Sequence, residues 1–209
     1  LILLPFSISP AMAEAVYSVW AIPPEGVTQR LKKMMSGLRS EFGGPEFEPH
    51  ITVVGATRLT REDAIRKLRS ACAAGGLRTY TARISAVSRG GFFYQCVYLL
   101  VEPTPEVRPQ EALTVMAASA HCCDHFEYEK ATPYMPHLSL LYGDLSDDVK
   151  ERAVERAKEL DENVCGLSFP VTMLALYKTD TEDKTLKSWE KVAVCDLSGD
   201  GAGCQLCEC

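Results

Sequence analysis

A short motif that contains histidine occurs twice in this chain. Residues 49–52 read Pro-His-Ile-Thr and residues 136–139 read Pro-His-Leu-Ser, so a proline precedes each histidine and a hydroxyl side chain follows two residues later. Composition alone predicts roughly 0.03 chance occurrences of such a tetrapeptide in a chain of this size. The repetition indicates one active site that is assembled from two distant segments.

Both motifs lie in apolar segments that favour strands. Residues 51–54 read Ile-Thr-Val-Val and residues 138–142 read Leu-Ser-Leu-Leu-Tyr, and the proline stands at each strand entrance, where no ladder hydrogen bond is needed. Because residues i and i+2 of a strand share a face, His50 lies with Thr52 and His137 lies with Ser139. We therefore predict strands at 50–57 and 136–143 that present two imidazoles and two hydroxyls to one phosphate group.

These four side chains suit the opening of a cyclic phosphate by water. The attacking water must lose a proton while the leaving sugar oxygen gains one, and histidine, with an ordinary pKa of about 6.5, supplies either role near neutral pH. Thr52 and Ser139 would donate hydrogen bonds to the non-bridging oxygens. Because this chemistry requires neither a metal nor a cofactor, we expect neither.

The hydrophobic pattern alternates strands with helices. The first half predicts a strand at 16–22, a helix at about 25–42, the strand at 50–57, a helix from the capping residue Thr60 to about 73, and a hairpin of 78–88 and 91–101. The second half predicts a helix at about 111–126, the strand at 136–143, a helix from the capping residue Ser146 to about 160, and strands at 167–178 and 188–196. This order predicts an α+β protein.

The negative net charge limits the kinds of molecule that the protein is expected to bind. The net charge of -6 argues against long nucleic acid, whose binding depends on a broad basic surface. No apolar stretch approaches the roughly 18 residues that a membrane span needs. We expect a cytoplasmic monomer whose partner is a small nucleotide, with no membrane partner.

Four longer segments resemble the plant cyclic phosphodiesterase branch of the two-histidine (2H) phosphoesterases. They are residues 16–21, 38–42, 132–142 and 178–186, and the resemblance covers about residues 14–197. It implies one bilobal domain with two pseudo-symmetric lobes, each an antiparallel sheet with flanking helices, around a central cleft. By sequence the lobes span approximately 14–102 and 103–197, with exchange of strands between them allowed.

The resemblance implies an activity and a set of catalytic roles. The activity is hydrolysis of ADP-ribose 1″,2″-cyclic phosphate, which arises downstream of tRNA splicing, to ADP-ribose 1″-phosphate, together with opening of nucleoside 2′,3′-cyclic phosphates to 2′-phosphates. By the family pattern, His137 activates the water and His50 protonates the leaving group. Thr52 and Ser139 then hold the phosphate.

The resemblance also implies aromatic contacts with the substrate from Trp20, Tyr94 and Tyr142, and a disulfide between Cys72 and Cys195. Each aromatic residue has a structural alternative. Trp20 lies in an apolar strand and would serve equally as core. Tyr94 lies in the predicted strand 91–101, on a face that would also suit the core. Tyr142 lies an odd number of residues after His137, so only a bulge or the end of the strand would turn it toward the site.

The remaining histidines have a spacing that zinc sites use. His121 and His125 lie four residues apart on a predicted helix, with Cys122 and Cys123 between them. Against a metal, Asp124 does not occupy the position of a metalloprotease glutamate, no further ligand cluster follows, and histidines suit the end of a helix. We predict no metal site.

The two ends of the chain lie outside the resemblance. We interpret residues 1–13 as upstream translated sequence or a processing remnant. Residues 198–209 contain Cys204, Cys207 and Cys209, which offer three sulfurs where a closed zinc site needs four ligands. The sequence favours a disordered tail.

Other function classes remain alongside the cyclic phosphodiesterase. RNA end processing or ligation would use the same two-histidine chemistry, but the chain lacks a basic stripe. A nucleotide-binding module without catalysis would not require a proton donor and a proton acceptor. A hydrolase that depends on a divalent metal is a further alternative, which EDTA would test.

Overall fold

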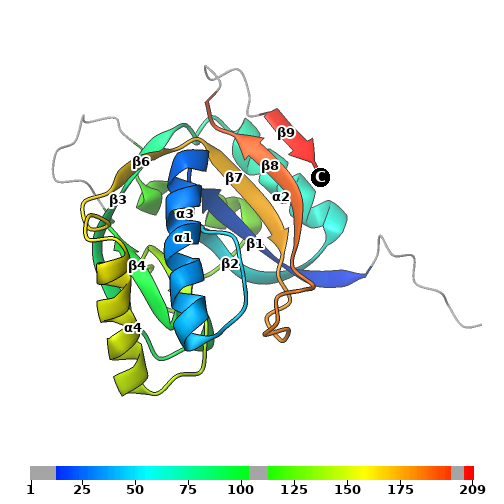
Figure 1. The fold of residues 1–209 in the computed structure, drawn as a ribbon. Helices are drawn as coiled ribbons and strands as arrows, with labels where there is room; N and C mark the ends of the chain where they lie inside the picture. Colours follow the sequence, from blue (N-terminus) through cyan, green and yellow to red (C-terminus); the bar gives the residue numbers. More distant parts are fainter. Residues whose placement is uncertain (1–12, 104–112, 199–204) are drawn as a thin grey trace, which may run out of the picture.

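The computed structural model describes residues 13–103, 113–198 and 205–209 (Figure 1). Its elements, in chain order, are β1 (Glu14–Ile22), α1 (Glu25–Phe42), β2 (Ile51–Thr60), α2 (Arg61–Ala73), β3 (Tyr80–Arg89), the 3-10 turn η2 (Phe93–Gln95), β4 (Val97–Val101), α3 (Val115–Phe126), β5 (His137–Leu141), α4 (Asp147–Leu160), β6 (Ser168–Val171), β7 (Met173–Lys178), β8 (Glu190–Asp196) and β9 (Gln205–Glu208). The expected α+β class is confirmed.

The strands form one sheet whose halves do not follow the halves of the chain. Its order is β6-β3-β4-β5-β2-β1-β7-β8-β9, and each neighbouring pair is antiparallel. Strands β5 and β6 thus join β3 and β4, while β7 and β8 join β1 and β2. The exchange brings the two motif strands, β2 and β5, side by side in the middle of the sheet.

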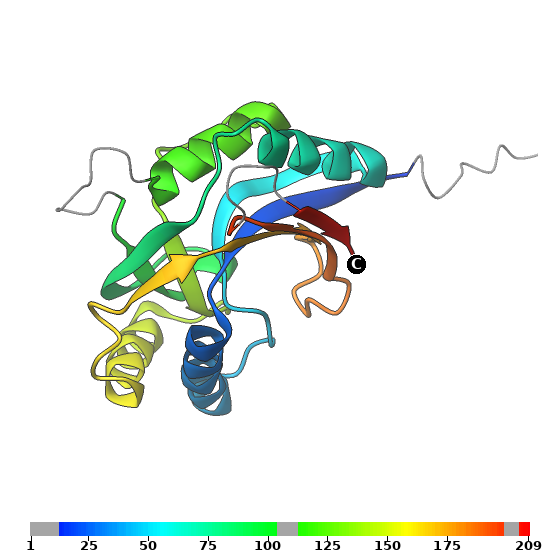
Figure 2. The same ribbon diagram turned by 90° about the horizontal axis from the view of Figure 1, so that it is seen from above.

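Helices cover both faces of this sheet. Figure 2 shows α2 and α3 together on one face and α1 and α4 on the opposite face. Their apolar sides enter the core, for example Leu31, Met34 and Leu38 of α1, which are at most 2% exposed. Spacing of three and four residues places these side chains on one side of the helix.

Local signals in the sequence account for the helix boundaries. The expected helix 25–42 is confirmed at both ends. The Thr60 hydroxyl accepts a hydrogen bond from the Asp63 backbone N–H, as expected of the residue that caps α2. Ser146 stands at the N-cap of α4, but its side chain makes no capping hydrogen bond. The helix expected at about 111–126 begins at Val115, with Thr114 as its N-cap, and residues 111–112 lie outside the described residues.

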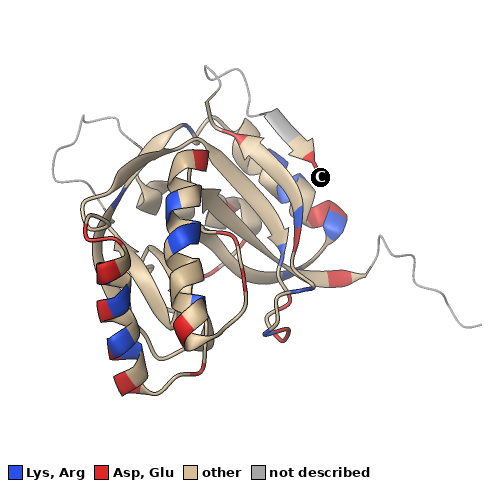
Figure 3. Cartoon of the chain, viewed as in Figure 1, with Lys and Arg blue, Asp and Glu red and all other residues tan. Residues whose placement is uncertain are grey.

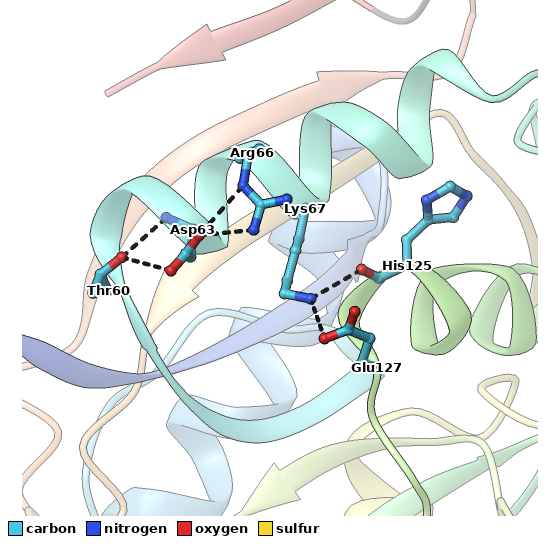
Figure 4. A network of polar contacts seen from close by, with 6 residues as sticks. All are labelled: Thr60, Asp63, Arg66, Lys67, His125 and Glu127. Carbon is cyan, nitrogen blue, oxygen red and sulfur yellow. Dashed lines mark hydrogen bonds and ion pairs between the residues drawn. The ribbon is translucent and has the colours of Figure 1, made fainter.

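An ion pair and a disulfide are among the side-chain links that join α2 to its neighbours. Lys67 is 7% exposed, and its ammonium donates to the Glu127 carboxylate at 2.9 Å, just beyond the end of α3 (Figure 4). Glu127 itself takes a left-handed conformation, with φ of 53°, and so turns the chain away from α3. The expected disulfide between Cys72 and Cys195 is present and connects α2 to β8.

The second strand of the expected hairpin, residues 91–101, is shorter than predicted. Residues 92–96 leave the sheet in a loop that contains η2, and β4 begins only at Val97. The loop starts at Gly90 and Gly91, and the Gly90 N–H donates to the Cys96 carbonyl at 3.2 Å. Glycine favours such turns, so the alternation of side chains expected for Tyr94 does not apply.

Two further expectations at the end of the chain need correction. The single strand expected at 167–178 is divided at Thr172, because β6 pairs with β3 whereas β7 pairs with β1. Pro170 fits this arrangement, since β6 is an edge strand. The tail is not wholly disordered, because Gln205–Glu208 forms β9 on the open edge of β8. Cys204 lies outside the described residues.

Gly44 offers a test of how the segment before His50 packs. Its φ of 98° is unfavourable for other residues, and an added Cβ would lie 2.5 Å from the Tyr142 carbonyl oxygen. We expect Gly44→Ala to lower the free energy of unfolding by about 1–3 kcal/mol in urea denaturation. Gly26→Ala is the control, because nothing lies within 4 Å of its added Cβ. Equal stability of the two variants would contradict this packing.

Candidate active site

The two motifs meet at a single point of contact between β2 and β5. Ile51 pairs with Leu138, and both side chains are fully buried on the core face. In an antiparallel pair this register sets His50 beside Ser139 and Thr52 beside His137, all on the opposite face. The two histidines are then diagonal neighbours, about 7–8 Å apart by the general geometry of sheets, with their Cβ atoms somewhat closer.

The same backbone hydrogen bond orients each histidine. His50 Nδ1 lies 2.6 Å from the Glu48 carbonyl oxygen, and His137 Nδ1 lies 2.9 Å from the Met135 carbonyl oxygen. A carbonyl only accepts, so each Nδ1 carries a proton and each Nε2 presents the lone pair that can take up a second one. The intervening proline holds the preceding residue extended, which fixes the carbonyl in place.

His50 is the more deeply buried imidazole. It is 5% exposed and stacks on Trp20, with ring centroids 3.6 Å apart and ring planes 9° from parallel. Burial lowers its pKa to about 4; the Glu48 carbonyl opposes this effect and the nearby His137 adds to it. His50 is therefore neutral at pH 7 in the free protein.

His137 lies closer to solvent. Burial lowers its pKa below the ordinary 6.5, and the Met135 carbonyl opposes that shift. The edge of Tyr98 packs against it at 5.3 Å between ring centroids, and the Gln95 amide nitrogen lies 3.3 Å from its Nε2. Gln95 is a neighbour that sequence reasoning missed, because nothing in the loop 90–96 indicates that it faces the second motif.

The two hydroxyls of the motifs also face the histidines. Ser139 is 5% exposed, and its Oγ donates to the Tyr94 carbonyl at 3.0 Å. A hydroxyl has one proton, so Ser139 must release this bond before it donates to a phosphate. Thr52 is partly exposed, and its carbonyl accepts from the Tyr134 hydroxyl at 2.7 Å.

An aromatic cavity of about 320 Å³ opens beside the histidines. The structure brings all seven expected site residues to its wall: Trp20, His50, Thr52, Tyr94, His137, Ser139 and Tyr142. Sequence reasoning missed other residues of the wall, among them Ser18, Phe92, Gln95, Thr179, Thr181 and Trp189. The Pro-His motifs give no signal for these positions.

The three expected aromatic residues reach the cavity by different routes. Trp20 is a buried residue, 2% exposed, that also lines the aromatic cavity, where it stacks on His50. Tyr142 is the first residue after β5, and there it stacks on Phe47 with centroids 3.8 Å apart. The end of the strand thus resolves its odd offset from His137. Tyr94 comes from η2, and its hydroxyl donates to the Thr181 carbonyl at 2.7 Å.

The loop between β7 and β8 forms the opposite wall. The Asp183 carboxylate accepts hydrogen bonds from the backbone and side chains of Thr185 and Ser188. The Trp189 indole N–H donates to the Asp180 carbonyl at 2.8 Å. These bonds hold the indole of Trp189 against Tyr94, at 5.8 Å between ring centroids.

A second cavity, of about 420 Å³, also borders the two motifs, at Thr52 and His137. It shares Thr52, Gln95 and His137 with the aromatic cavity. The rest of its wall comes chiefly from the segment after α3, including Tyr128, Lys130 and Tyr134. Figure 3 shows that charged residues gather on the helices α1, α2 and α4, and no aspartate or glutamate of the described chain lines either cavity.

The remaining histidines lie away from this site, on α3. Their ring centroids are 4.7 Å apart; His121 Nε2 donates to the Ala71 carbonyl and His125 Nδ1 bonds to the Ser70 hydroxyl. Across residues 13–103, 113–198 and 205–209, no three histidine, cysteine or acidic side chains are grouped so as to hold a metal ion. No helix in these ranges is long and apolar enough to cross a membrane.

Comparison with known proteins places this geometry in a family. Residues 14–200 match the family described as cyclic phosphodiesterase-like protein. A cyclic phosphodiesterase of Arabidopsis thaliana is 52% identical over 183 residues, which cover 88% of this chain and 96% of that protein. A 2′,3′-cyclic-nucleotide 3′-phosphodiesterase of Yarrowia lipolytica is 28% identical over 68% of this chain and 81% of its own length.

Solved structures share the fold at low sequence identity. LigT of E. coli in complex with 3′-AMP is 12% identical, with a TM-score of 0.56, and the match covers 90% of this chain and all of LigT. LigT in complex with NADP+ gives 14% identity and a TM-score of 0.54 over 88% and 98% of the two chains. From the family match and the similarity to the Arabidopsis protein, the chain belongs to the cyclic phosphodiesterase-like family of 2H phosphoesterases.

Proposed function

We propose that this cyclic phosphodiesterase opens cyclic phosphates by proton transfer between His50, His137 and the substrate, without a metal ion. The observation that carries the proposal is the register of β2 and β5, which turns both imidazoles and both hydroxyls to one face. Each Nε2 is the ring nitrogen left for proton transfer, because each Nδ1 is engaged with a backbone carbonyl. At His137 the Gln95 amide, 3.3 Å from Nε2, must give way when Nε2 takes the proton.

The proposed substrate is ADP-ribose 1″,2″-cyclic phosphate, with nucleoside 2′,3′-cyclic phosphates as secondary substrates. Water attacks phosphorus and gives its proton to His137 Nε2. The bond between phosphorus and the 2″ oxygen breaks, and His50 Nε2 gives its proton to that oxygen, which yields ADP-ribose 1″-phosphate. The proton gained by His137 equals the one lost by His50, and exchange with solvent restores the starting state.

The hydroxyls and the aromatic wall complete this arrangement. Thr52 and Ser139 donate to the non-bridging oxygens, on which negative charge is held during the transfer. Of the three expected aromatic residues, Tyr94 is partly exposed and offers a flat surface to a base or ribose in the aromatic cavity. Trp20 is stacked between His50 and Tyr177, so it supports the histidine, and Tyr142 is stacked on Phe47. We assign the protein to the cytoplasm, as a monomer, in the metabolism of by-products of tRNA splicing, on the resemblance that its sequence carries.

The pKa values support the direction of transfer. His50, with a pKa of about 4, is a strong proton donor once protonated, whereas the less deeply buried His137 is the better base. Because the pKa of His50 is the lower of the two, the productive form of the free protein, with His50 protonated and His137 neutral, is a minor species near neutral pH. A bound phosphate anion raises the pKa of both rings and favours that form.

We expect His50→Ala and His137→Ala each to lower kcat by about two to four orders of magnitude, because each removes one proton transfer. Thr52→Ala and Ser139→Ala should each lower kcat by a smaller factor, since each removes one of several hydrogen bonds to the phosphate. Steady-state kinetics on a cyclic phosphate measure these losses. His125→Ala is the matched control outside the site, and near-normal turnover of either motif histidine variant would overturn the assignment.

The pH dependence of kcat/KM gives a second test. The productive pair holds one proton, so kcat/KM should fall about tenfold per pH unit once the pH exceeds the pKa of His137, which lies below 6.5. It should fall again below about pH 4, where His50 also gains a proton in the free protein. A value of kcat/KM that rises from pH 6 to pH 8 would contradict the pair.

Metal independence and the bond that breaks are tested together. The protein is incubated in EDTA with ADP-ribose 1″,2″-cyclic phosphate or with a nucleoside 2′,3′-cyclic phosphate, and phosphorus NMR follows the products. We expect ADP-ribose 1″-phosphate and a nucleoside 2′-phosphate at undiminished rates. Loss of activity in EDTA, restored by a divalent metal, would instead favour a metal-dependent hydrolase.

A further inference from the structure

His137 borders two cavities of different chemistry. The aromatic cavity presents rings and hydroxyls and has no lysine or arginine in its wall. The second cavity, of about 420 Å³, has Lys130 in its wall. Because the two share Thr52, Gln95 and His137, a ligand at the motifs reaches both.

Lys130 is a cation without an anionic partner in the described part of the chain. Its Nζ lies over the Tyr134 ring, 4.9 Å from the centroid, and its side chain is partly buried. A ring face holds an ammonium in place but leaves its N–H donors able to bind an anion. The second cavity therefore provides a positioned positive charge with no carboxylate in the wall to compete for it.

The segment that carries Lys130 is fastened to the catalytic strand. The Tyr134 hydroxyl donates to the Thr52 carbonyl at 2.7 Å, so the ring beneath Lys130 is linked to the first motif. Tyr128 lies so close to Gly55 of β2 that a Cβ there would clash with the tyrosine hydroxyl. Lys130 is thus held relative to the histidines by contacts on both sides.

We propose that the second cavity is an anion subsite, in which Lys130 binds the diphosphate of the substrate while the cyclic phosphate lies between His50 and His137. The inference rests on the proposed function and deepens it. In ADP-ribose 1″,2″-cyclic phosphate the diphosphate is attached to C5″ of the ribose that carries the cyclic phosphate, so it extends only one sugar from the reacting phosphorus. A nucleoside 2′,3′-cyclic phosphate with a free 5′-hydroxyl places no charge there.

This subsite gives Lys130 a role in specificity and none in the chemical step. Lys130 should lower KM for substrates that carry a second phosphate and leave kcat nearly unchanged, since the bond to the diphosphate is the same in the ground state and the transition state. A charge-assisted hydrogen bond of this kind corresponds to about a tenfold change in affinity.

The test compares Lys130→Ala with Lys130→Arg, which keeps the charge, and with Lys33→Ala, a control on an exposed lysine of α1. Three substrates are used: ADP-ribose 1″,2″-cyclic phosphate, adenosine 2′,3′-cyclic phosphate, and the same nucleotide with a 5′-phosphate. We expect Lys130→Ala to raise KM about tenfold for the first and third substrates only. Lys130→Arg should keep KM for these two substrates close to that of the wild-type protein. Added salt should reduce the difference in KM between the wild-type protein and Lys130→Ala.

The outcomes separate the subsite from the substrate assignment. If Lys130→Ala affects all three substrates equally, or none, the subsite is wrong while the proposed function stands. If the wild-type protein opens both nucleotides but not the ADP-ribose compound, the substrate assignment is wrong. The effect on the 5′-phosphorylated nucleotide then decides the subsite alone: a selective rise in KM supports it, and no selective rise overturns it.

Discussion

The pairing of Ile51 with Leu138 is the contact on which the site depends. Two strands from distant parts of the chain touch there, and the full burial of both side chains fixes which face each strand turns to the core. Side chains alternate along a strand, so a slip of one residue in either strand would carry its histidine to the wrong face. The apolar residues between the reactive ones are therefore as necessary to the geometry as the histidines.

The burial that holds the imidazole rings of His50 and His137 in place also lowers their pKa values. The stack of Trp20 on His50 covers one side of the imidazole, and burial lowers the pKa of this ring to about 4. The carbonyls of Glu48 and Met135 act in the opposite sense, because they favour the protonated rings. The carbonyl directly before each motif thus orients the histidine, and the proline that begins the motif holds that carbonyl in place.

Much of the fold and the central part of the site were predictable from local sequence signals. The helix 25–42, the Thr60 cap and the two motif strands follow from periodicity and capping residues, which act within a few positions. The route of the chain through the sheet was not predictable in this way. The division of strand 167–178 at Thr172 depends on which distant strand each part pairs with, and β9 exists because β8 offers an open edge.

The same limit applies to the walls of the cavities. Gln95, Trp189 and Lys130 lie on loops whose direction is decided by tertiary contacts, such as the turn at Gly90 and the left-handed residue Glu127. The sequence predicts Tyr94 on one face of a strand, but the loop that contains η2 places it in the wall of the aromatic cavity. Motifs in the sequence therefore locate the reacting centre, whereas the surrounding surface requires the folded chain.

The hydrogen bond from Tyr94 to the Thr181 carbonyl joins two loops across the mouth of the aromatic cavity before any ligand arrives. Together with the network around Asp183, this bond links the two loops that supply walls of the cavity. Loops that are already linked have less conformational freedom to lose when a ligand binds. We therefore expect affinity to depend on how well a base fits the space between them.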